Sequence, residues 1–523
     1  MAAVGSRKGV RTGFKFRWLW AAPTMNFSFE VKETDLLGRI GSLRAGGSTL
    51  ETPYMFPVIH PVNQLVTTET LSSMRFGGLM TNSYIIYSRR KEEALRKGIR
   101  RLLNFGGLFM TDSGGYQVLE YGDLEIGCRD VATFQAEIGS DLAVTLDKPT
   151  GYPQKRSTAL ETVNYSLKNA QATLKEFGDR STVWVGPIQG GLYFDLVRRS
   201  ATSMVKAGFE FLALGSPVQV MQNYMFADLV RMVIAAKKAI PYSIPLHLFG
   251  AGHPLTMSLA VALGCDTFDS ASYIIFARSG RYMSRGGVMT LQTMKYLPCS
   301  CPVCSRSSVR ELLELEHGER TRLLATHNLY VLREELESCK EAISEGRLWD
   351  LVQERSMAHP RLREAFVELA KHAEYLSLGT PVLKERGLFV RSALDLRRPE
   401  LTGAATRLAW AMSRSSKGAL LSAGEDTKRP DSRGRNPGPD RYRNHPILGP
   451  FPAELEFQYP FSQTEVATTV PRVSDDQAKK RLRQLGYASV SAAGRRGSGR
   501  RIRNRRSRRG ASPSPPSPSA RSR

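Results

Sequence analysis

The 523-residue sequence contains no uninterrupted run of about 18 apolar residues, the length that a membrane-spanning helix requires. It also lacks a secretory signal, because the apolar stretch 18–22 behind the basic N-terminus is shorter than the core of roughly 7–15 residues that such a signal needs. Its six cysteines are too few for a disulfide framework. Together these absences predict a cytoplasmic protein with no membrane partner.

Acidic residues are scarce at both ends of the chain. The net charge is +25, of which residues 1–24 contribute +5 and residues 471–523 contribute +14. Basic ends suit a polyanion, most often nucleic acid, although a solvated tail without a ligand has the same composition. The body is more ordinary, and 41% hydrophobic residues are enough to bury a large core.

Eight short apolar runs recur about every 30 residues between residues 50 and 270, each followed by a longer stretch with helical character. They are continuous rather than alternating, as expected of parallel strands covered on both faces. The intervening stretches, such as 156–177 and 219–239, have the amphipathic pattern of crossover helices. The predicted strands are Tyr54–Ile59, Gly78–Thr81, Gly107–Thr111, Leu142–Leu146, Val183–Ile188, Phe211–Leu214, Ile244–Phe249 and Asp266–Phe268.

Eight such units close into an α/β fold of the (β/α)8 TIM-barrel type, whose active site lies where the strands end. An open doubly wound sheet would also place ligands at strand ends, but the GxGxxG opening typical of that fold is missing. We therefore predict a barrel with a structural zinc subdomain and a C-terminal extension. The predicted organisation is a basic extension (1–24), the barrel (25–290), a zinc-binding helical subdomain (291–375), a C-terminal segment (376–412), a linker or insertion (413–440), a small region (441–490) and a disordered Arg/Ser/Pro-rich tail (491–523).

The motif CSCPVC is the strongest local signal. It places Cys299, Cys301 and Cys304 within six positions, and His327 follows 23 positions later. Three thiolates and one imidazole complete a tetrahedral Zn²⁺ shell and leave no open position, so we predict a structural zinc ion. His317 is a weaker candidate for the fourth ligand, because its HGER surroundings are polar.

A second set of polar residues follows the predicted strands. Asp112 begins the sequence DSGGYQ after the third strand, Asp147 follows the fourth, Gln189 the fifth and Asp269 the eighth. A single Asp in such a place often only caps the next helix, but three carboxylates and an amide at one barrel face indicate chemistry. Two carboxylates across a pocket can divide the work of cleaving a glycosidic bond, one attacking the anomeric carbon and one moving a proton.

With these motifs the sequence resembles the tRNA-guanine transglycosylases, and in particular their archaeal branch. The matching segments are MTNSYIIY (80–87), MTDSGGYQVLEYGD (110–123), SDLAVTLDKPT (140–150), GPIQGG (186–191), LALGSPV (212–218), HLFGAGHP (247–254), CDTFDSASY (265–273) and CSCPVC with HNLYV (299–331). The resemblance extends from about residue 25 to residue 375, and more loosely to YPFSQTE at 459–465.

The resemblance implies a role for each matching residue. Asp269 matches the nucleophile that attacks C1′ of the target nucleoside, and Asp112 matches the acid/base. The residues matching those that hydrogen-bond the base are Ser113, Asp147, Gln189 and the backbone of Gly215, while Tyr116 and Phe249 match the two that sandwich it. The family further implies tRNA, guanine and 7-cyano-7-deazaguanine (preQ0) as partners, and a homodimer.

Two features depart from that family. Lys148 stands where an aliphatic residue is more usual, which would alter the charge near the base. A compact C-terminal RNA-binding domain is not evident, and the Arg-rich tail stands in its place.

The leading hypothesis is replacement of guanine 15 in the tRNA D-arm by preQ0. The alternatives are anticodon-directed exchange, a non-catalytic tRNA-binding subunit, which the presence of Asp112 and Asp269 disfavours, and a polysaccharide-cleaving barrel, which has no use for zinc or basic ends.

Overall fold

A computed structural model describes residues 27–115, 126–178, 181–412, 419–421, 440–487 and 490–492. The basic N-terminal extension and nearly all of the Arg-rich tail lie outside these residues. No helix among them is both long and apolar enough to cross a lipid bilayer. They form two compact units, one containing the described residues up to Ala411 together with Phe457–Pro471, the other the remainder from Met412 onward.

All eight predicted strands are present, each within a few residues of its expected bounds. They are β4 (Tyr54–Pro57), β5 (Gly78–Asn82), β6 (Leu108–Asp112), β7 (Leu142–Val144), β8 (Val183–Ile188), β9 (Phe211–Leu214), β10 (Leu246–Leu248) and β11 (Thr267–Ser270). Most of their residues are buried, which explains the continuous apolar runs.

The strands pair in parallel in the order β4-β11-β10-β9-β8-β7-β6-β5. The two ends of this order also meet, because Val58 and Met80 form a parallel bridge and the Ile59 N–H donates to the Met80 carbonyl at 2.8 Å. The sheet is therefore a closed (β/α)8 barrel, as predicted, and not an open doubly wound sheet.

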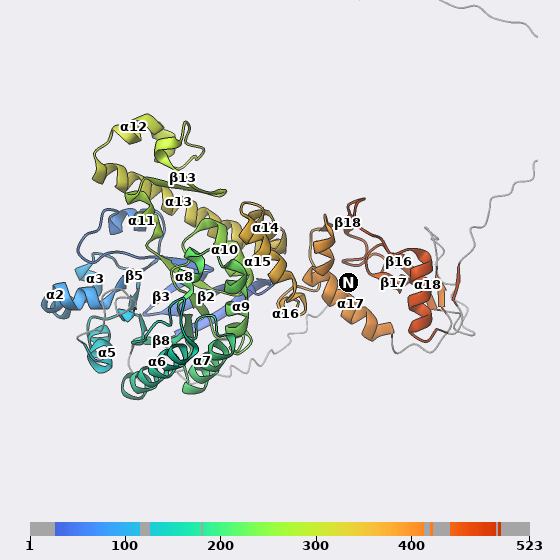
Figure 1. The fold of residues 1–523 in the computed structure, drawn as a ribbon, viewed down its shortest axis with the longest axis horizontal. Coiled ribbons are helices and arrows are strands. Elements are labelled where there is room, and N and C mark those ends of the chain that lie inside the picture. Colours follow the sequence, from blue (N-terminus) through green and yellow to red (C-terminus); the bar gives the residue numbers. More distant parts are fainter. Residues whose placement is uncertain are drawn as a thin grey trace, which may run out of the picture. The chain divides into compact units, whose positions relative to one another are not determined.

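The crossover helices lie around the outside of the strands (Figure 1). In α7, for example, Leu196, Val197, Ser200, Ala201 and Met204 are buried at helical spacing, and Gly208 ends the helix with φ of 97°. The helices are α1 (Thr68–Ser73), α2 (Ser83–Lys97), α3 (Ile99–Leu102), α5 (Cys128–Glu137), α6 (Arg156–Phe177), α7 (Phe194–Ala207), α8 (Pro217–Gln222), α9 (Phe226–Lys237) and α10 (Pro254–Ala262).

An antiparallel sheet that sequence analysis did not anticipate covers the N-terminal mouth of the barrel. Its strands are β1 (Phe27–Asp35), β2 (Gly38–Ala45) and β3 (Ser48–Thr52). Phe27 stacks on Phe211, the first residue of β9, with ring centroids 5.8 Å apart, and Leu43 and Leu50 are buried in the same cluster as the first residues of the barrel strands. The mouth opposite the predicted site is thus filled with apolar side chains.

A buried ion pair fastens this sheet to the barrel. Arg39 on β2 donates from Nε to Asp266 Oδ1 at 2.8 Å and from NH2 to Asp266 Oδ2, and both side chains are almost fully buried. Asp266 also accepts the Leu246 N–H at 2.8 Å, and the guanidinium lies over the rings of Phe29 and Tyr242. Neither charge has access to water, so each depends on the other.

Replacing Arg39 by methionine is expected to destabilise the first unit by about 3–5 kcal/mol, because the Asp266 carboxylate is left buried and unpaired. The lowering of the thermal unfolding midpoint measures the effect. The double variant Arg39→Met with Asp266→Asn removes both charges and should recover a large part of the loss. A single variant that melts like the wild type would show that the pair adds nothing.

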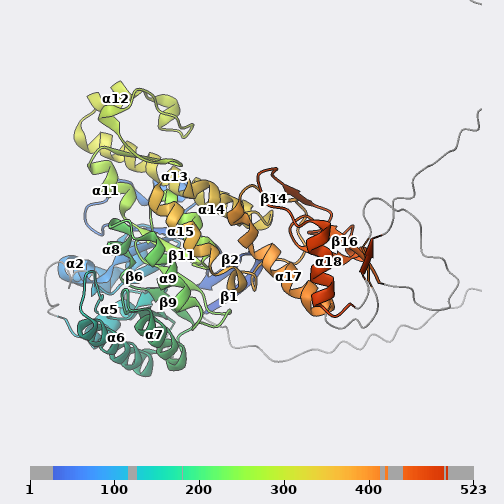
Figure 2. The ribbon, with the colours of Figure 1, turned by 45° about the vertical axis from the view of Figure 1, so that its right-hand side comes forward.

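A zinc-motif lobe and a helical layer follow the barrel. Helix α12 stands away from the barrel at one end of the long helix α13 in both views (Figures 1 and 2). The elements are α11 (Ser272–Arg278), β12 (Arg281–Ser284), β13 (Gly287–Thr290), the short 3-10 helices η1 (Leu291–Thr293) and η2 (Cys304–Arg306), α12 (Val309–Glu314), α13 (His317–Ser344), α14 (Leu348–Ser356), α15 (Pro360–Ala370) and α16 (Ala373–Leu376). They are followed by β14 (Leu388–Val390), η3 (Ala393–Arg397) and α17 (Pro399–Met412), and β14 pairs with the later strand β18 (Thr464–Val466).

In the residues that the structure describes, the second unit contains a four-stranded sheet in the order β17-β16-β15-β19, with helix α18 against it. Its elements are β15 (Ala419–Leu421), β16 (Asp440–His445), β17 (Gly449–Pro452), η4 (Ala453–Leu455), α18 (Asp475–Gln484) and β19 (Val490–Ala492). Most of the predicted linker at 413–440 lies outside the described residues. The domain boundaries drawn from sequence remain predictions.

Candidate active site and metal centre

A cavity of about 990 Å³ opens at the carboxyl ends of the barrel strands. Six of the residues predicted from the sequence line it, each from a different strand or the turn that follows that strand. They are Asp112, Asp147, Gln189, Gly215, Phe249 and Asp269. Because parallel strands of a barrel all end at the same face, residues far apart in the chain meet here.

Asp112 ends β6 and faces the neighbouring strand. Its Oδ2 accepts hydrogen bonds from Asn82 Nδ2 at 2.9 Å and from the Gly114 N–H at 3.3 Å. Burial, and then the charge of Asp269, raise the pKa of Asp112 to about 6. A carboxyl with such a pKa can both give and take a proton near neutral pH.

The two carboxylate oxygens of Asp269 differ in their hydrogen bonds. Its Oδ1 accepts the Gly250 N–H at 2.7 Å and lies 3.1 Å from His247 Nε2, whereas Oδ2 takes no hydrogen bond from the described residues. His247 is fully buried, and its Nδ1 lies 2.9 Å from Thr267 Oγ1. Since a carboxylate only accepts, Nε2 carries a hydrogen and donates it to Asp269 Oδ1, while the contact with Thr267 fixes the orientation of the ring.

Asp147 and Gln189 form a buried polar pair in the cavity wall. Gln189 Nε2 donates to Asp147 Oδ2 at 2.6 Å, and Gln189 Oε1 accepts from the Thr150 N–H at 3.0 Å and from Ser216 Oγ at 2.9 Å. These bonds fix which end of the amide points at Asp147. Burial, and then the charge of Asp112, raise the pKa of Asp147 to about 7.

Two glycines are required by this packing. A Cβ on Gly215 would lie 2.2 Å from Gln189 Nε2, and one on Gly115 would lie 2.3 Å from Asp147 Oδ1. Any side chain at these positions would displace the polar pair from the cavity wall. The backbone therefore approaches the site closely on both sides, as a narrow slot for a flat ligand requires.

The remaining predicted site residues are placed differently. Ser113 is fully buried and does not line the cavity, and its hydroxyl has no hydrogen-bond partner among the described residues. Phe249, in the cavity wall, lies edge-on against His247 with ring centroids 4.9 Å apart. Tyr116 lies outside the described residues. Lys148 is not a cavity residue, since its Nζ lies 3.5 Å from Glu161 Oε1 and its side chain is 37% exposed. The positive charge of Lys148 therefore does not lie in the cavity wall, where the sequence had suggested an effect on the base.

Three groups that hold the carboxylates were not predicted from the sequence: Asn82, His247 and the Gly250 N–H. Asn82 ends β5 one strand before Asp112, so its place at a strand end was the available signal. His247 stands between two leucines in β10. A histidine in such a place is as typical of a hydrogen-bonded core residue as of a site residue, so the sequence did not single it out. A backbone donor leaves no signal in the sequence.

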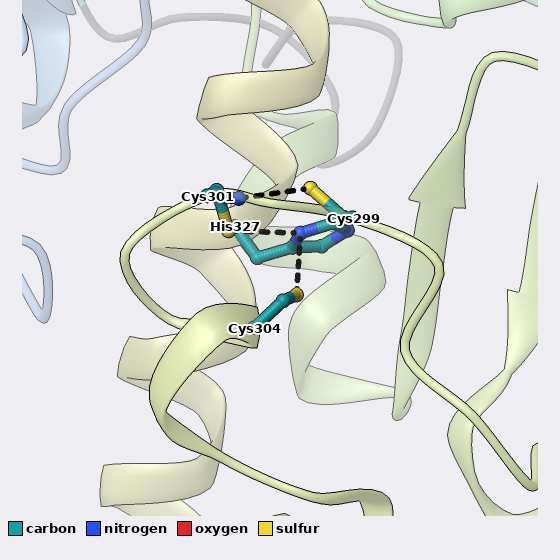
Figure 3. Close-up of side chains that lie close together, drawn as sticks. All are labelled: Cys299, Cys301, Cys304 and His327. Atoms are coloured by element: carbon teal, nitrogen blue, oxygen red, sulfur yellow. Dashed lines mark hydrogen bonds between the residues drawn. The ribbon is translucent and has the colours of Figure 1, made fainter.

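Four ligand groups converge between the loop before η2 and helix α13 (Figure 3). The ligand atoms of Cys299, Cys301, Cys304 and His327 all lie within 4.8 Å of one another, and His327 Nδ1 is 3.3 Å from Cys304 Sγ and 3.5 Å from Cys301 Sγ. This is the Cys₃His set predicted from sequence, and it can hold a metal ion. His317 is not part of it, being exposed and bonded to Arg320 instead.

The surroundings of His327 prepare it as a ligand. Its Nε2 donates to the Met283 carbonyl at 2.9 Å, so Nδ1 is the nitrogen that faces the sulfur atoms and would bind the ion. Tyr282 stacks on the imidazole with centroids 3.8 Å apart, and its hydroxyl lies 3.4 Å from Cys304 Sγ. The donor set therefore fits a resident tetrahedral ion with no position left for water.

Residues 34–361 match the family model described as queuine tRNA-ribosyltransferase. The chain belongs to this family. The matched range contains every residue of the cavity and of the Cys₃His set that is named above, including the three carboxylates and His247.

Relatives in the queuine tRNA-ribosyltransferase family include three archaeal proteins, each named tRNA-guanine(15) transglycosylase. The protein from Thermococcus kodakarensis is 41% identical over 87% of this chain and 75% of its own length. The protein from Sulfolobus acidocaldarius is 37% identical over 89% of this chain and 95% of its own length, and that from Aeropyrum pernix is 41% identical over 84% and 87%. The family resemblance seen in the motifs is thus confirmed over most of the chain.

Proposed function

We propose that this chain is a tRNA-guanine(15) transglycosylase that replaces guanine 15 of the tRNA D-arm by preQ0. The supporting observation is that Asp112 and Asp269 meet in one cavity with a base-sized polar wall, in a chain about 40% identical to archaeal proteins of that name. A non-catalytic subunit would not need Asp112 and Asp269 to be held in the cavity by hydrogen bonds from Asn82, His247 and the Gly250 N–H.

In the first proposed step, the free Oδ2 of Asp269 attacks C1′ of the target nucleoside. The C1′–N9 bond breaks, its electron pair passes to N9 of guanine, and protonated Asp112 gives that nitrogen its proton. Asp269 then carries the ribose as an ester. Because the charge of Asp269 raises the pKa of Asp112, esterification lowers that pKa and favours the proton transfer.

In the second step, Asp112, now ionised, accepts the proton from N9 of the incoming preQ0. This nitrogen attacks C1′ and expels the Asp269 carboxylate, so one glycosidic bond replaces another and no nucleotide cofactor is needed. The leaving carboxylate is received by the Gly250 N–H and by His247. The enzyme ends each turnover in the state in which it began.

Base recognition falls to the cavity wall in this proposal. Phe249 supports one face of the purine, and Tyr116 is proposed for the other. Asp147 and the amide of Gln189 offer hydrogen bonds to the polar edge, beside the backbone of Gly215. A base lacking a matching group leaves one of these buried partners unpaired, which is costly.

We further propose that the ion held by Cys299, Cys301, Cys304 and His327 is Zn²⁺ with a structural role. The same proposal includes a homodimer and a cytoplasmic location, where reduced thiols and tRNA are both present. The binding of tRNA also fits the basic ends of the sequence.

The test is base exchange by the purified full-length protein. Labelled guanine or labelled preQ0 is incubated with a tRNA transcript, and the labelled nucleotide is mapped by nuclease digestion. We expect incorporation at position 15 and none into a transcript in which guanine 15 is replaced by adenine. Label at the anticodon would identify anticodon-directed exchange, and absence of label with intact tRNA binding would identify a non-catalytic subunit.

Replacing His247 by phenylalanine is expected to lower kcat by about 10- to 100-fold with little change in KM for tRNA. The ring volume is kept, but Asp269 loses a hydrogen bond to its carboxylate, which is worth about 1.5–3 kcal/mol. Steady-state kinetics with preQ0 and full-length tRNA measure the two constants.

The conservative variant His247→Gln offers an N–H at the position of Nε2 and should restore much of kcat. Thr267→Val, which removes the hydroxyl that orients the imidazole, should fall between wild type and His247→Phe. A purely structural role for His247 would instead lower the unfolding midpoint and give His247→Gln no advantage over His247→Phe.

A further inference from the structure

The cavity extends well beyond the base-binding wall. Its volume of about 990 Å³ is far more than one purine fills, and its outer part is lined by the turn after α8 and by the start of α15. Tyr224 and His359 stand in this outer part, on the same cavity as Asp112 and Asp269. The mechanism proposed above assigns neither residue a task.

Tyr224 is held as a fixed aromatic surface. Its ring stacks on that of His359 with centroids 5.0 Å apart and an interplanar angle of 23°, and Phe226 meets it edge-on at 5.8 Å. The backbone of Tyr224 lies in the left-handed region with φ of 57°, and its N–H donates to the Met221 carbonyl at 3.0 Å. Even so, 55% of the residue is exposed.

His359 is fixed in turn. Its Nδ1 accepts the Arg361 N–H at 3.1 Å and so caps the start of α15. A tyrosine in the left-handed backbone region, backed by a second fixed ring and left half open to a cavity, is a position of the kind that clusters at ligand-binding sites.

We propose that Tyr224, backed by His359, is a stacking platform for the nucleobase next to the target in the same tRNA. This inference rests on the proposed function. Attack at C1′ requires the target nucleotide to be withdrawn from its stack, which exposes a flat face of its neighbour. Aromatic side chains bind such faces whatever the base, because every base has one.

The charges around the platform fit an RNA strand that continues past the catalytic carboxylates. Arg278 and Arg281 line the same cavity, and neither forms an ion pair with a carboxylate among the described residues. The guanidinium of Arg281 lies 4.2 Å from the ring centre of Phe276, another cavity residue. The occupant is therefore a nucleotide and not an apolar segment of protein.

The test combines protein variants with altered tRNA. Tyr224→Phe keeps the ring, whereas Tyr224→Leu keeps apolar bulk but loses the flat surface. Each is assayed for base exchange with intact tRNA and with tRNAs that lack the base on one side or the other of nucleotide 15. Tyr165→Leu, at a 42% exposed tyrosine on α6 that does not line the cavity, is the matched control.

We expect Tyr224→Leu to lower kcat/KM about 10- to 100-fold on intact tRNA, and Tyr224→Phe and Tyr165→Leu to stay within about twofold of wild type. On the tRNA lacking the stacked base, wild type and Tyr224→Leu should become equal. An equal loss on all three tRNAs, or no loss, would overturn the platform. If wild type exchanges no base at nucleotide 15, the proposed function itself fails, which is a distinct outcome.

Discussion

Asp269→Asn is expected to abolish base exchange, with a loss of about 10⁴-fold or more, while tRNA affinity stays close to that of the wild type. An amide oxygen is a poor nucleophile and could not be expelled again as a stable carboxylate. The substitution changes only a charge at a position where the backbone and His247 already fix the side chain. Exchange of labelled guanine and a gel-shift measurement of tRNA binding separate the two effects.

The covalent intermediate gives a second readout of the same variant. Wild-type protein quenched in denaturant during exchange should carry RNA that migrates with it, and Asp269→Asn should carry none. Asp112→Asn is the matched control, since it removes the carboxylate proposed as the acid/base from the same cavity and leaves Asp269 in place. An adduct that persists with Asp269→Asn and disappears with Asp112→Asn would reverse the two roles.

The second large effect is expected for Cys301→Ala. This substitution removes one of four donors from a closed metal shell, and structural zinc contributes about 10–16 kcal/mol of apparent binding energy to folding in small domains. The variant should be largely insoluble, and its soluble fraction should contain almost no zinc. Soluble yield and metal content per chain are the measurements.

Cys339→Ala is the appropriate comparison, because Cys339 is a fully buried thiol on α13 that does not belong to the metal cluster. It should retain zinc and lose only about 1 kcal/mol of stability, through lost packing. A soluble, active Cys301→Ala protein without metal would contradict a structural role for the ion.

The barrel was predictable because its strands are covered on both faces. Helices cover the outside and barrel side chains fill the inside, so each strand appears in the sequence as an unbroken apolar run. The strands of the N-terminal sheet have a different sequence pattern, because one face of the sheet is solvated. In β1, Phe27, Phe29 and Val31 alternate with polar residues, the pattern of a strand with one solvated face, and that pattern was the signal available.

The metal ligands were also predictable, but the choice between two histidines depended on helix geometry. His317 and His327 both lie on α13, ten residues apart, which separates them by about 15 Å along the helix axis. Only His327 faces the cysteine loop. The donors to Asp269 were not predictable, because a lone histidine in a strand and a backbone N–H have no distinctive sequence pattern.

The sheet that fills the N-terminal mouth of the barrel also limits the routes by which free bases can enter and leave. With Phe27, Leu43 and Leu50 packed across that end, no base can pass through the barrel. In the exchange proposed above, the outgoing guanine and the incoming preQ0 therefore both use the mouth of the cavity through which the RNA enters, while Asp269 holds the ribose. Each expelled guanine stays close to the site and competes with preQ0 for the second step. We therefore expect net exchange to depend on the ratio of the two bases in solution rather than on the amount of preQ0 alone.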